Sequence, residues 1–471
     1  MADNIIKFGT DGWRGVIADT FTFENLAKAA QAYADYLKAE GKAGASLVVG
    51  YDHRFLGKRF AELVAEILWA NGFKVLPADK PLPTPTVSYA VKHYDLAGGV
   101  MITASHNPAN YSGFKIKTPP GCSADVNTTK GIEAQVGKNE PIRISRSEAE
   151  KLGLVLQGDP EKVYLEWVDS FIDKKLLSSK PLKVLVDSLY GVGKTYIADI
   201  LNKLGHQAET IRSDRNPAFL GIAPEPVPPN MAESLAKTVK ENFDVCLVTD
   251  GDADRLAAAD NRGEYIITPK IALILALYFM KCKGWSGKIV KTVSCSRTID
   301  RFCEKYNIPL EEKPVGFKYI VPYLIDGSAL VCTEESGGLG YQKHIPERDG
   351  VLSGLLFTEA LIGLGFKNAG EAMDYVDSEF GKLRYHRIDK ACDPNARDAF
   401  MQRLETEPPA EILGRKVVNI KTIDGVKFEL EDDSWLLLRF SGTEPVCRFY
   451  AEAPTLAEAE KMTEFGASLL K

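Results

Sequence analysis

A pattern of strand, helix, strand, helix and strand occurs three times along the chain. The three copies cover residues 46–103, 182–249 and 288–332. Alternation of strands and helices at this spacing predicts mostly parallel sheets with helices on both faces. The last strand of each copy runs into a loop of small and polar residues, and open α/β sheets place their chemistry at such carboxyl ends. We therefore expect three related α/β domains in mixed sheets, each contributing one loop to a shared cleft.

The remainder of the chain has a different pattern. Four strand candidates follow one another closely, at residues 417–421, 426–430, 435–440 and 446–451. Asp424-Gly425 between the first two is a hairpin signal, and helical patterns flank the strands. This pattern predicts a C-terminal α+β domain with an antiparallel sheet. The expected domains are residues 1–148, 149–256, 257–375 and 376–471.

Composition narrows the class of protein and its partners. The 471 residues are 45% hydrophobic and 26% charged, as in ordinary globular proteins, and the net charge is −6. A negative chain is a poor match for nucleic acid or an anionic membrane, so we expect neither partner. The apolar run 271–280 is too short to span a bilayer and suits a buried helix. Eight scattered cysteines without a C-x-x-C motif, and a start without a basic signal region, favour a reduced, cytoplasmic protein.

Thr103-Ala-Ser-His-Asn-Pro108 follows the last strand of the first copy. Pro108 biases the residue before it away from helix, which predicts a constrained turn. Ser105 beside His106 is a candidate nucleophile, although an ordinary Ser/Asn/Pro turn is the alternative when this segment is considered alone.

Asp250, Asp252 and Asp254 alternate with small residues after the last strand of the second copy. Alternate side chains of an extended segment point the same way, so the three carboxylates can converge on one hard cation, Mg²⁺ or Mn²⁺. A calcium loop of the EF-hand type is excluded, because its sixth and twelfth positions hold Arg255 and Asn261. An acidic surface turn is the remaining alternative, and Arg255 could hold a phosphate oxygen.

Three further segments are rich in phosphate-binding or sugar-binding residue types. Phe8–Gly15 surrounds Arg14 with glycines, and Glu334–Gly338 offers acceptors and small residues suited to hydroxyl groups. Arg439–Pro445 combines a guanidinium, the hydroxyls of Ser441 and Thr443, and the free backbone at Gly442. Simple turns are the alternative for each segment taken alone.

Together these motifs resemble the α-D-phosphohexomutase superfamily, which includes phosphoglucomutases and phosphomannomutases. The resemblance covers nearly the whole chain and rests on five motifs in family order: FGTDGWRG, TASHNP followed by GFK, TDGDADR, EESGG and RFSGTEP. It implies a heart-shaped protein of four domains around one cleft.

The resemblance also implies roles for individual residues. Ser105 would carry the transferable phosphate, with Mg²⁺ held by a phosphoserine oxygen and by Asp250, Asp252 and Asp254. Glu334 and Ser336 would bind sugar hydroxyls. The phosphate that is not transferred would be bound by Arg439, Ser441, Gly442 and Thr443.

The implied reaction interconverts hexose 1-phosphate and hexose 6-phosphate through a hexose 1,6-bisphosphate. Arg255 and Mg²⁺ would stabilise charge on the phosphoryl group. We expect His106, Lys115 and Arg14 near the transferred proton, and Lys318 to face the cleft from the third domain. The partner is a small phosphosugar, and a monomer or weak dimer is expected.

One departure from the family pattern concerns the sugar. Many bacterial members end the EESGG-type loop in Gly-His, whereas this chain has Gly337-Gly338. The nearby HIPERDG segment is more like the phosphoglucomutase branch, where His344 could compensate, and this favours glucose phosphates over mannose phosphates. A glucose-1,6-bisphosphate synthase and a non-catalytic phosphosugar-binding protein are the alternatives.

Overall fold

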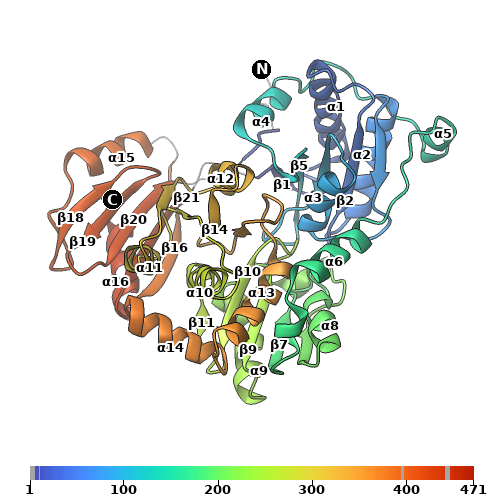
Figure 1. Cartoon of the computed structure of the whole chain (residues 1–471). Helices are drawn as coiled ribbons and strands as arrows, with labels where there is room; N and C mark the ends of the chain where they lie inside the picture. The colour runs from blue at the N-terminus through green and yellow to red at the C-terminus, as the bar shows by residue number, and fades with distance from the viewer. Residues whose placement is uncertain (1–5, 10, 394–396, 441–445, 471) are drawn as a thin grey trace.

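Four β-sheets form the frame of the molecule, which is a computed structural model describing residues 6–9, 11–393, 397–440 and 446–470. The N-terminal domain lies at the upper right of Figure 1 and the C-terminal domain at the left, with the second and third domains between them. Each sheet corresponds to one of the four units expected from the sequence.

The first sheet has the strand order β1-β5-β4-β2-β3, and β6 pairs with β5. Its strands are β1 (Trp13–Val16), β2 (Ser46–Tyr51), β3 (Lys74–Pro77), β4 (Gly98–Ile102), β5 (Tyr111–Thr118) and β6 (Cys122–Ser123). Its helices are α1 (Phe23–Ala39), α2 (Gly57–Ala70), α3 (Thr84–His93), α4 (Val126–Glu133) and α5 (Arg146–Lys151).

The second sheet has the order β11-β10-β9-β7-β8. Its strands are β7 (Lys183–Asp187), β8 (Gln207–Ile211), β9 (Val245–Thr249), β10 (Leu256–Asp260) and β11 (Tyr265–Ile266). Its helical segments are α6 (Pro160–Phe171), α7 (Lys174–Leu177), α8 (Tyr196–Lys203), η1 (Phe219–Gly221) and α9 (Pro228–Lys240).

The third sheet has the order β13-β12-β14-β15. Its strands are β12 (Lys288–Thr292), β13 (Leu310–Lys313), β14 (Ala329–Thr333) and β15 (Leu339–Tyr341). Its helical segments are α10 (Thr268–Lys281), α11 (Thr298–Tyr306), η2 (Phe317–Tyr319), α12 (Val321–Ile325), α13 (Gly350–Gly363) and α14 (Ala369–Phe380).

The fourth sheet is antiparallel throughout, in the order β16-β21-β20-β19-β18-β17. Its strands are β16 (Arg384–Ala391), β17 (Glu411–Ile412), β18 (Arg415–Lys421), β19 (Val426–Leu430), β20 (Trp435–Phe440) and β21 (Val446–Ala453). Helices α15 (Arg397–Thr406) and α16 (Leu456–Ser468) accompany it.

The three α/β sheets share one arrangement of strands, which the sequence pattern predicted only in part. In each, the first strand of the repeat pairs in parallel with the second and third strands. The chain then returns in an antiparallel strand, β5, β10 or β15, which was not predicted. Each polar loop is therefore the turn of an antiparallel pair. Because β10 and β11 belong to the second sheet, that sheet continues past the expected boundary at 256.

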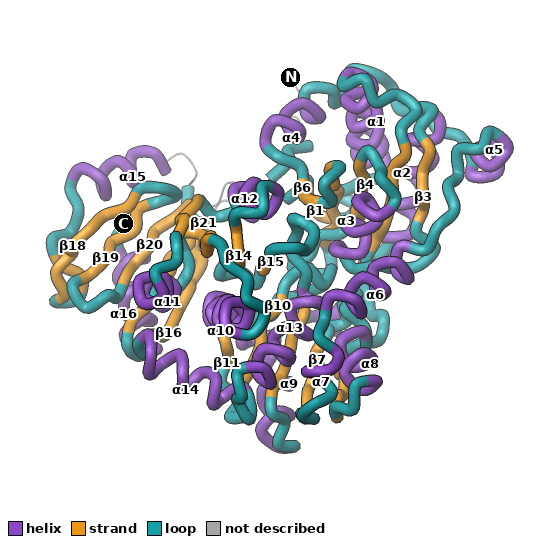
Figure 2. Tube along the Cα trace, viewed as in Figure 1, coloured by secondary structure: helices purple, strands orange, loops and turns teal. Residues whose placement is uncertain are grey.

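The second and third domains share a hydrophobic core, whereas the first and fourth have cores of their own. The apolar run 271–280 lies within α10, and its residues 271–279 are buried on all sides, as expected for a helix that is hydrophobic all round. Helices α10 and α13 lie between the strands of the second and third domains (Figure 2). The middle of the molecule is thus one packed body that carries two of the loops.

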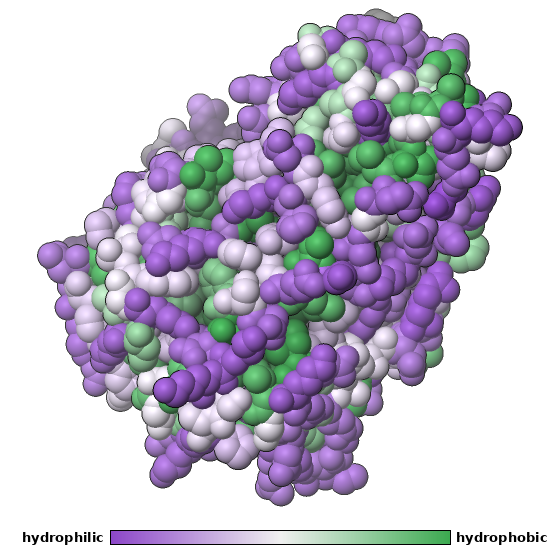
Figure 3. Space-filling model, turned by 45° about the vertical axis from the view of Figure 1, so that its right-hand side comes forward, coloured by the Kyte–Doolittle hydropathy of each residue, from purple (hydrophilic) through white to green (hydrophobic). Residues whose placement is uncertain are grey.

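Polar side chains dominate the face of the molecule shown in Figure 3, and the apolar atoms form separate patches. Within the described ranges, each helix is either too short or too polar to cross a membrane. All eight cysteines lie in the described residues and are free.

Candidate active site

Ser105 lies in the turn between β4 and β5, in the segment Thr103–Pro108, which we name the serine loop. Its backbone is left-handed, with φ of 51°, a conformation that costs a residue other than glycine about 1–3 kcal/mol. The side chain is buried, and its Oγ donates a hydrogen bond to Oδ2 of Asp250 at 2.6 Å. The serine loop therefore contacts the carboxylates of the second domain directly.

A buried arginine, Arg54, holds the serine loop in this strained shape. Its guanidinium donates hydrogen bonds to the carbonyl oxygens of Ser105, Asn107, Pro108 and Tyr111 at 2.5–3.0 Å. Asp52 lies beside it, 3.3 Å from Nε of Arg54, and accepts a hydrogen bond from Thr103 at 2.6 Å. Sequence reasoning missed Arg54, although two charged residues directly after the buried strand β2 were a signal.

Asp250, Asp252 and Asp254 form a cluster in the turn between β9 and β10, in the segment Asp250–Arg255, which we name the metal loop. The three residues are buried, and one carboxylate oxygen from each lies within 4.8 Å of the other two. Oδ1 of Asp252 and Oδ1 of Asp254 are buried without a hydrogen-bond partner in the described part of the chain. Burial and the two neighbouring aspartates raise the pKa of Asp250 well above its ordinary value. Unpartnered hard oxygens with mutual repulsion fit a Mg²⁺ site.

Gly251 allows the metal loop to approach the serine loop. A Cβ atom at this position would lie 2.5 Å from the carbonyl oxygen of Ser105. Such a distance is far below van der Waals contact, so any side chain at residue 251 would push Asp250 away from Ser105.

Lys115 on β5 reaches across to the metal loop. Its Nζ lies 2.8 Å from Oδ2 of Asp252, 3.1 Å from Oδ2 of Asp254 and 2.8 Å from Oδ2 of Asp11. Burial alone would lower the pKa of Lys115, but these three carboxylates outweigh it and raise the pKa above its ordinary value. Lys115 is therefore a fixed cation that orients two aspartates.

His106 and Arg14 flank Ser105. Arg14 donates a hydrogen bond to Oδ1 of Asn107 at 2.6 Å. Burial lowers the pKa of His106 well below its ordinary value, and the charges of Arg255, Arg14, Arg387 and Arg448 lower it further. The imidazole is thus neutral, and its buried Nδ1 has no hydrogen-bond partner among the residues that the structure describes.

Glu334–Gly338, which we name the sugar loop, lies in the turn between β14 and β15 and touches the metal loop. Arg255 donates a hydrogen bond from Nη1 to the carbonyl oxygen of Ser336 at 3.2 Å, and the backbone N–H of Leu256 donates to the carbonyl oxygen of Gly337 at 3.0 Å. Burial raises the pKa of Glu334 to about 7, although Arg348 opposes this shift. The sugar loop and the metal loop are therefore held in register by contacts to backbone atoms.

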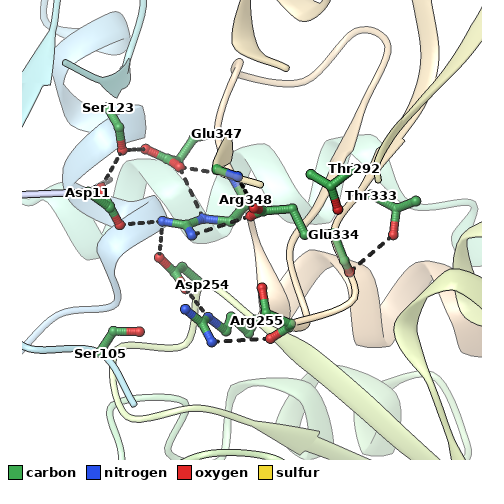
Figure 4. A network of polar contacts seen from close by, with 12 residues as sticks. Asp11, Ser105, Ser123, Asp254, Arg255, Thr292, Thr333, Glu334, Glu347 and Arg348 are labelled. Carbon is green, nitrogen blue, oxygen red and sulfur yellow. Dashed lines mark hydrogen bonds and ion pairs between the residues drawn. The ribbon is translucent and has the colours of Figure 1, made fainter. Parts of the chain in front are cut away.

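Arg348 lies at the centre of the polar network in Figure 4, between Asp11, Asp254 and Glu334. Sequence reasoning noted this arginine only as part of the HIPERDG segment. Its partners come from three different domains, and no local pattern in the sequence links them.

His344 has a different position from the one expected. Its Nδ1 accepts a hydrogen bond from the indole N–H of Trp167, and its Nε2 lies 3.1 Å from Oδ2 of Asp349. Both ring nitrogens are therefore engaged in the interior, and His344 offers neither to a sugar. Asp349 caps the first turn of α13, so the histidine supports the start of that helix.

The fourth domain presents arginines toward the same region. Nε of Arg439 donates to Oδ2 of Asp424 at 2.6 Å, and Asp424 also accepts a hydrogen bond from the backbone N–H of Val315 at 3.0 Å. Lys318 follows in the same segment of the third domain and is half-buried. Ser441, Gly442 and Thr443, the other predicted phosphate-binding residues, lie outside the described residues.

A cavity of about 970 Å³ lies between the second, third and fourth domains. Its wall includes Glu335, Ser336 and Gly337 of the sugar loop and Arg387 on β16. Ligand sites of small molecules commonly occupy about 300–1,000 Å³, so the cavity is large enough for a sugar phosphate. It meets the site only at the sugar loop, because Ser105, the metal loop and Arg439 are not part of its lining.

Family models of the phosphoglucomutase/phosphomannomutase domains match four successive parts of the chain. The α/β/α domains I, II and III match residues 6–143, 162–263 and 269–378, and the C-terminal domain matches residues 401–467. The chain belongs to the phosphoglucomutase/phosphomannomutase family. The resemblance seen in the sequence and the four-domain α/β fold are both confirmed.

Relatives of this phosphohexomutase match it over nearly its whole length. A phosphoglucomutase/phosphomannomutase of Thermococcus kodakarensis is 27% identical, over 98% of both chains. A phosphoglucosamine/phosphogalactosamine mutase of Sulfurisphaera tokodaii is 31% identical, over 95% of both chains. A crystal structure of a Thermus thermophilus protein, provisionally described as a phosphomannomutase, has a TM-score of 0.86 and 33% identity over 99% of both chains.

These relatives show the reaction class of the phosphohexomutase but not its sugar. Their names span glucose, mannose and aminosugar phosphates. The family is Mg²⁺-dependent, and the aspartate cluster of this chain has the composition that such a site requires.

Proposed function

We propose that this phosphohexomutase interconverts glucose 1-phosphate and glucose 6-phosphate through phosphorylated Ser105 and a retained glucose 1,6-bisphosphate. The observation that carries the proposal is the contact between Ser105 Oγ and Asp250, within a cluster whose two remaining aspartates each keep one oxygen unpartnered among the described residues. A phosphoryl group on Ser105 would lie beside hard-cation ligands, where charge stabilisation has the largest effect.

The chemistry balances with the groups in the cleft. The bond between phosphorus and Oγ of Ser105 breaks as a free hydroxyl oxygen of the hexose phosphate bonds to phosphorus, and that hydroxyl loses its proton. The bisphosphate then reverses its orientation and returns its other phosphoryl group to Ser105. Bound Mg²⁺, held by the three aspartates, would neutralise charge on the phosphoryl group. Arg14 and Arg255 supply further positive charge on this side of the cleft.

His106 and Lys115 have separate roles beside the transferred phosphoryl group. His106 is neutral, with an unpartnered Nδ1 among the described residues, so it can accept a hydrogen bond from the reacting hydroxyl, while its lowered pKa makes it a weak base. Lys115 is held in its charged form by carboxylates. We assign His106 as acceptor and Lys115 as the positively charged partner that stabilises the metal-loop carboxylates.

Glucose is favoured over an aminosugar by the charge beside the sugar loop. Nη1 of Arg348 lies 3.7 Å from Oε2 of Glu334, so a fixed positive charge already faces this carboxylate. A 2-ammonium group would compete with that guanidinium and would be repelled by it. A neutral 2-hydroxyl meets no such conflict.

The test is a substrate panel of glucose, mannose, glucosamine and N-acetylglucosamine 1-phosphates, with and without glucose 1,6-bisphosphate. We expect the highest kcat/KM with glucose 1-phosphate, stimulation by the bisphosphate, and no turnover by Ser105→Ala. Intact-mass and peptide analysis after incubation with the bisphosphate should find one phosphoryl group on Ser105. A higher kcat/KM with glucosamine 1-phosphate would overturn the choice of sugar.

The same assay separates a mutase from a bisphosphate synthase. The reaction is followed for hexose 1-phosphate, hexose 6-phosphate and free bisphosphate together, with fructose 1,6-bisphosphate as an added phosphoryl donor. Accumulation of free bisphosphate in place of hexose 6-phosphate would replace the mutase assignment by the synthase assignment.

A further inference from the structure

We propose that Arg348 is a positioning residue that sets the geometry of both the metal loop and the sugar loop. Because Gly338 has no side chain, it leaves the space that the side chain of Arg348 occupies. The role for the sugar loop rests on the proposed function, whereas the role for the metal loop does not. Arg348 precedes α13, outside both loops, and its side chain is only 5% exposed.

Carboxylates from three domains surround Arg348 (Figure 4). Nη2 pairs with Asp11 of the first domain and lies 2.9 Å from Oδ2 of Asp254 in the second. Nη1 lies 3.7 Å from Oε2 of Glu334, and Nε lies 3.7 Å from Oε1 of Glu347, both in the third domain. A buried guanidinium with this many partners has little freedom to move, because any displacement leaves a buried carboxylate unpaired.

The contact with Asp254 determines which oxygen remains for a metal. Arg348 and Lys115 both approach Oδ2 of Asp254, at 2.9 and 3.1 Å, and Oδ1 is left without a hydrogen-bond partner in the described residues. Asp252 repeats the arrangement, since Oδ2 accepts hydrogen bonds from Thr84 and Lys115 while Oδ1 has none there. Lys115 and Arg348 thus orient both carboxylates so that Oδ1 of each remains available to a metal ion.

The contact with Glu334 fixes the other loop. The backbone N–H of Gly316 donates to Oε1 of Glu334 at 3.1 Å, and Arg348 faces Oε2. Glu334 therefore has a defined rotation, which a carboxylate that binds sugar hydroxyls requires.

Gly338 provides the room for this arrangement. A Cβ atom at residue 338 would lie 2.7 Å from Cδ of Arg348 and 2.9 Å from Oε2 of Glu334. The φ of Gly338 is not in the left-handed region, so alanine fits its backbone and only the side chains would have to shift. Replacing Gly338 therefore perturbs Arg348 without removing it.

Neighbouring charges keep the arginine in place. Glu347 pairs with Lys117 at 2.5 Å, and the single hydroxyl proton of Ser123 is shared between Oε2 of Glu347, 3.0 Å from Oγ, and Oδ1 of Asp11, 2.8 Å from Oγ. Glu347 is thus joined to Lys117 and Ser123 of the first domain, the domain that also carries Asp11 and Ser105.

The experiment compares Arg348→Met, Arg348→Lys and Gly338→Ala with the unmodified enzyme. The control is Arg301→Met, which removes an arginine that joins the third and fourth domains through Asp433. Mn²⁺ affinity is measured by electron paramagnetic resonance without substrate, KM and kcat with the preferred hexose phosphate, and Tm by calorimetry.

We expect Arg348→Met to weaken Mn²⁺ binding by about 10–100-fold, as for residues that orient metal ligands, and to raise KM about tenfold. Arg348→Lys and Gly338→Ala should show the same two effects at smaller size, and Arg301→Met should change Tm alone. Unchanged Mn²⁺ affinity in folded Arg348→Met would overturn the proposal, as would equal losses in Arg301→Met. If Arg348→Met does not fold, unchanged Mn²⁺ affinity and KM in Gly338→Ala overturn it. Because Mn²⁺ binding is measured without sugar, its result can be interpreted even if the proposed substrate is wrong.

Discussion

Nη2 of Arg54 donates a hydrogen bond to the carbonyl oxygen of Ser105 at 2.7 Å, so the residue expected to carry phosphate is held by this arginine through its backbone and not through its side chain. This arrangement leaves Oγ of Ser105 to interact with Asp250. The strained backbone and the reactive oxygen are controlled by two different domains.

Replacement of Arg54 by lysine should lower kcat more than it changes KM. Lysine keeps the charge but cannot reach four carbonyl oxygens, so the serine loop loses its fixed shape, and a shift of about 1 Å can reduce the rate about 100-fold. Steady-state kinetics of Arg54→Lys measures this effect. Arg59→Lys, on the exposed side of α2 beside Glu62, is the control and should match the unmodified enzyme. A KM effect without a kcat effect would contradict the prediction.

Replacement of Asp252 by asparagine should weaken metal binding and slow phosphoryl transfer by orders of magnitude. The change removes one of three anionic ligands and also the charge that faces Lys115. Mg²⁺ titration of turnover, with an EDTA blank, is the measurement. Asp374→Asn, an exposed residue paired with Arg262, serves as the control. Normal activity of Asp252→Asn in EDTA would show that the cluster does not hold the required metal.

Replacement of Arg439 by alanine should increase escape of the bisphosphate. The guanidinium is fixed by Asp424, which also binds the backbone of Val315 in the third domain, so under the proposed function it would present a constant charge to the distal phosphate. We expect a lower mutase rate and a higher ratio of free bisphosphate to hexose 6-phosphate. Arg415→Ala, whose partners Asp432 and Glu458 lie elsewhere in the fourth domain, should leave this ratio unchanged.

Lys427 should make stability depend on pH above neutrality. Its Nζ is buried where the third and fourth domains meet and donates to the carbonyl oxygen of Val293 at 2.8 Å. Burial, reinforced by Lys291, lowers the pKa of Lys427 from 10.5 to about 8. Between these pH values the unfolded chain binds more protons than the folded one, so stability rises with pH through that window.

The lowered pKa of Lys427 corresponds to a change of about 3 kcal/mol in the free energy of unfolding across this pH range. Urea denaturation of the enzyme and of Lys427→Met at about pH 7.5, 8.5 and 9.5 isolates it, because other titrating groups contribute equally to both proteins. We expect the free energy of unfolding of the enzyme to rise relative to that of the variant as the pH increases. A constant difference would mean that Lys427 titrates normally.

Much of the fold could be predicted from local patterns. Strands β2, β4, β9 and β14 are short apolar runs that end abruptly in polar residues, and the structure places each within one or two residues of its expected position. The loop after β2 meets the serine loop after β4 because both follow parallel strands at the same edge of the first sheet.

The return strands were not predictable in the same way. β5 contains Lys115 and Lys117, which are fully buried, and a charged residue at an interior position weakens any strand pattern. Both lysines are buried because carboxylates from other domains neutralise them. The role of Arg348 could not be predicted for the same reason, since Asp11 and Asp254 come from other domains. The backbone partners of Arg54 lie about 50 residues further along the same domain. His344 shows the converse, since proximity in sequence to the sugar loop did not bring it into the cleft.

The serine loop, the metal loop and the sugar loop each join the two strands of an antiparallel pair, and this position limits how their sequences can change. Strand pairing on both sides fixes the length of the loop, and one added residue would advance the chain by about 3.3 Å and turn its side chains to the opposite face. Ser105 would then miss Asp250, since the hydrogen bond that joins them spans only 2.6 Å. Insertions and deletions should therefore be confined to the opposite ends of the sheets, and variation within the loops themselves to replacement of one side chain by another.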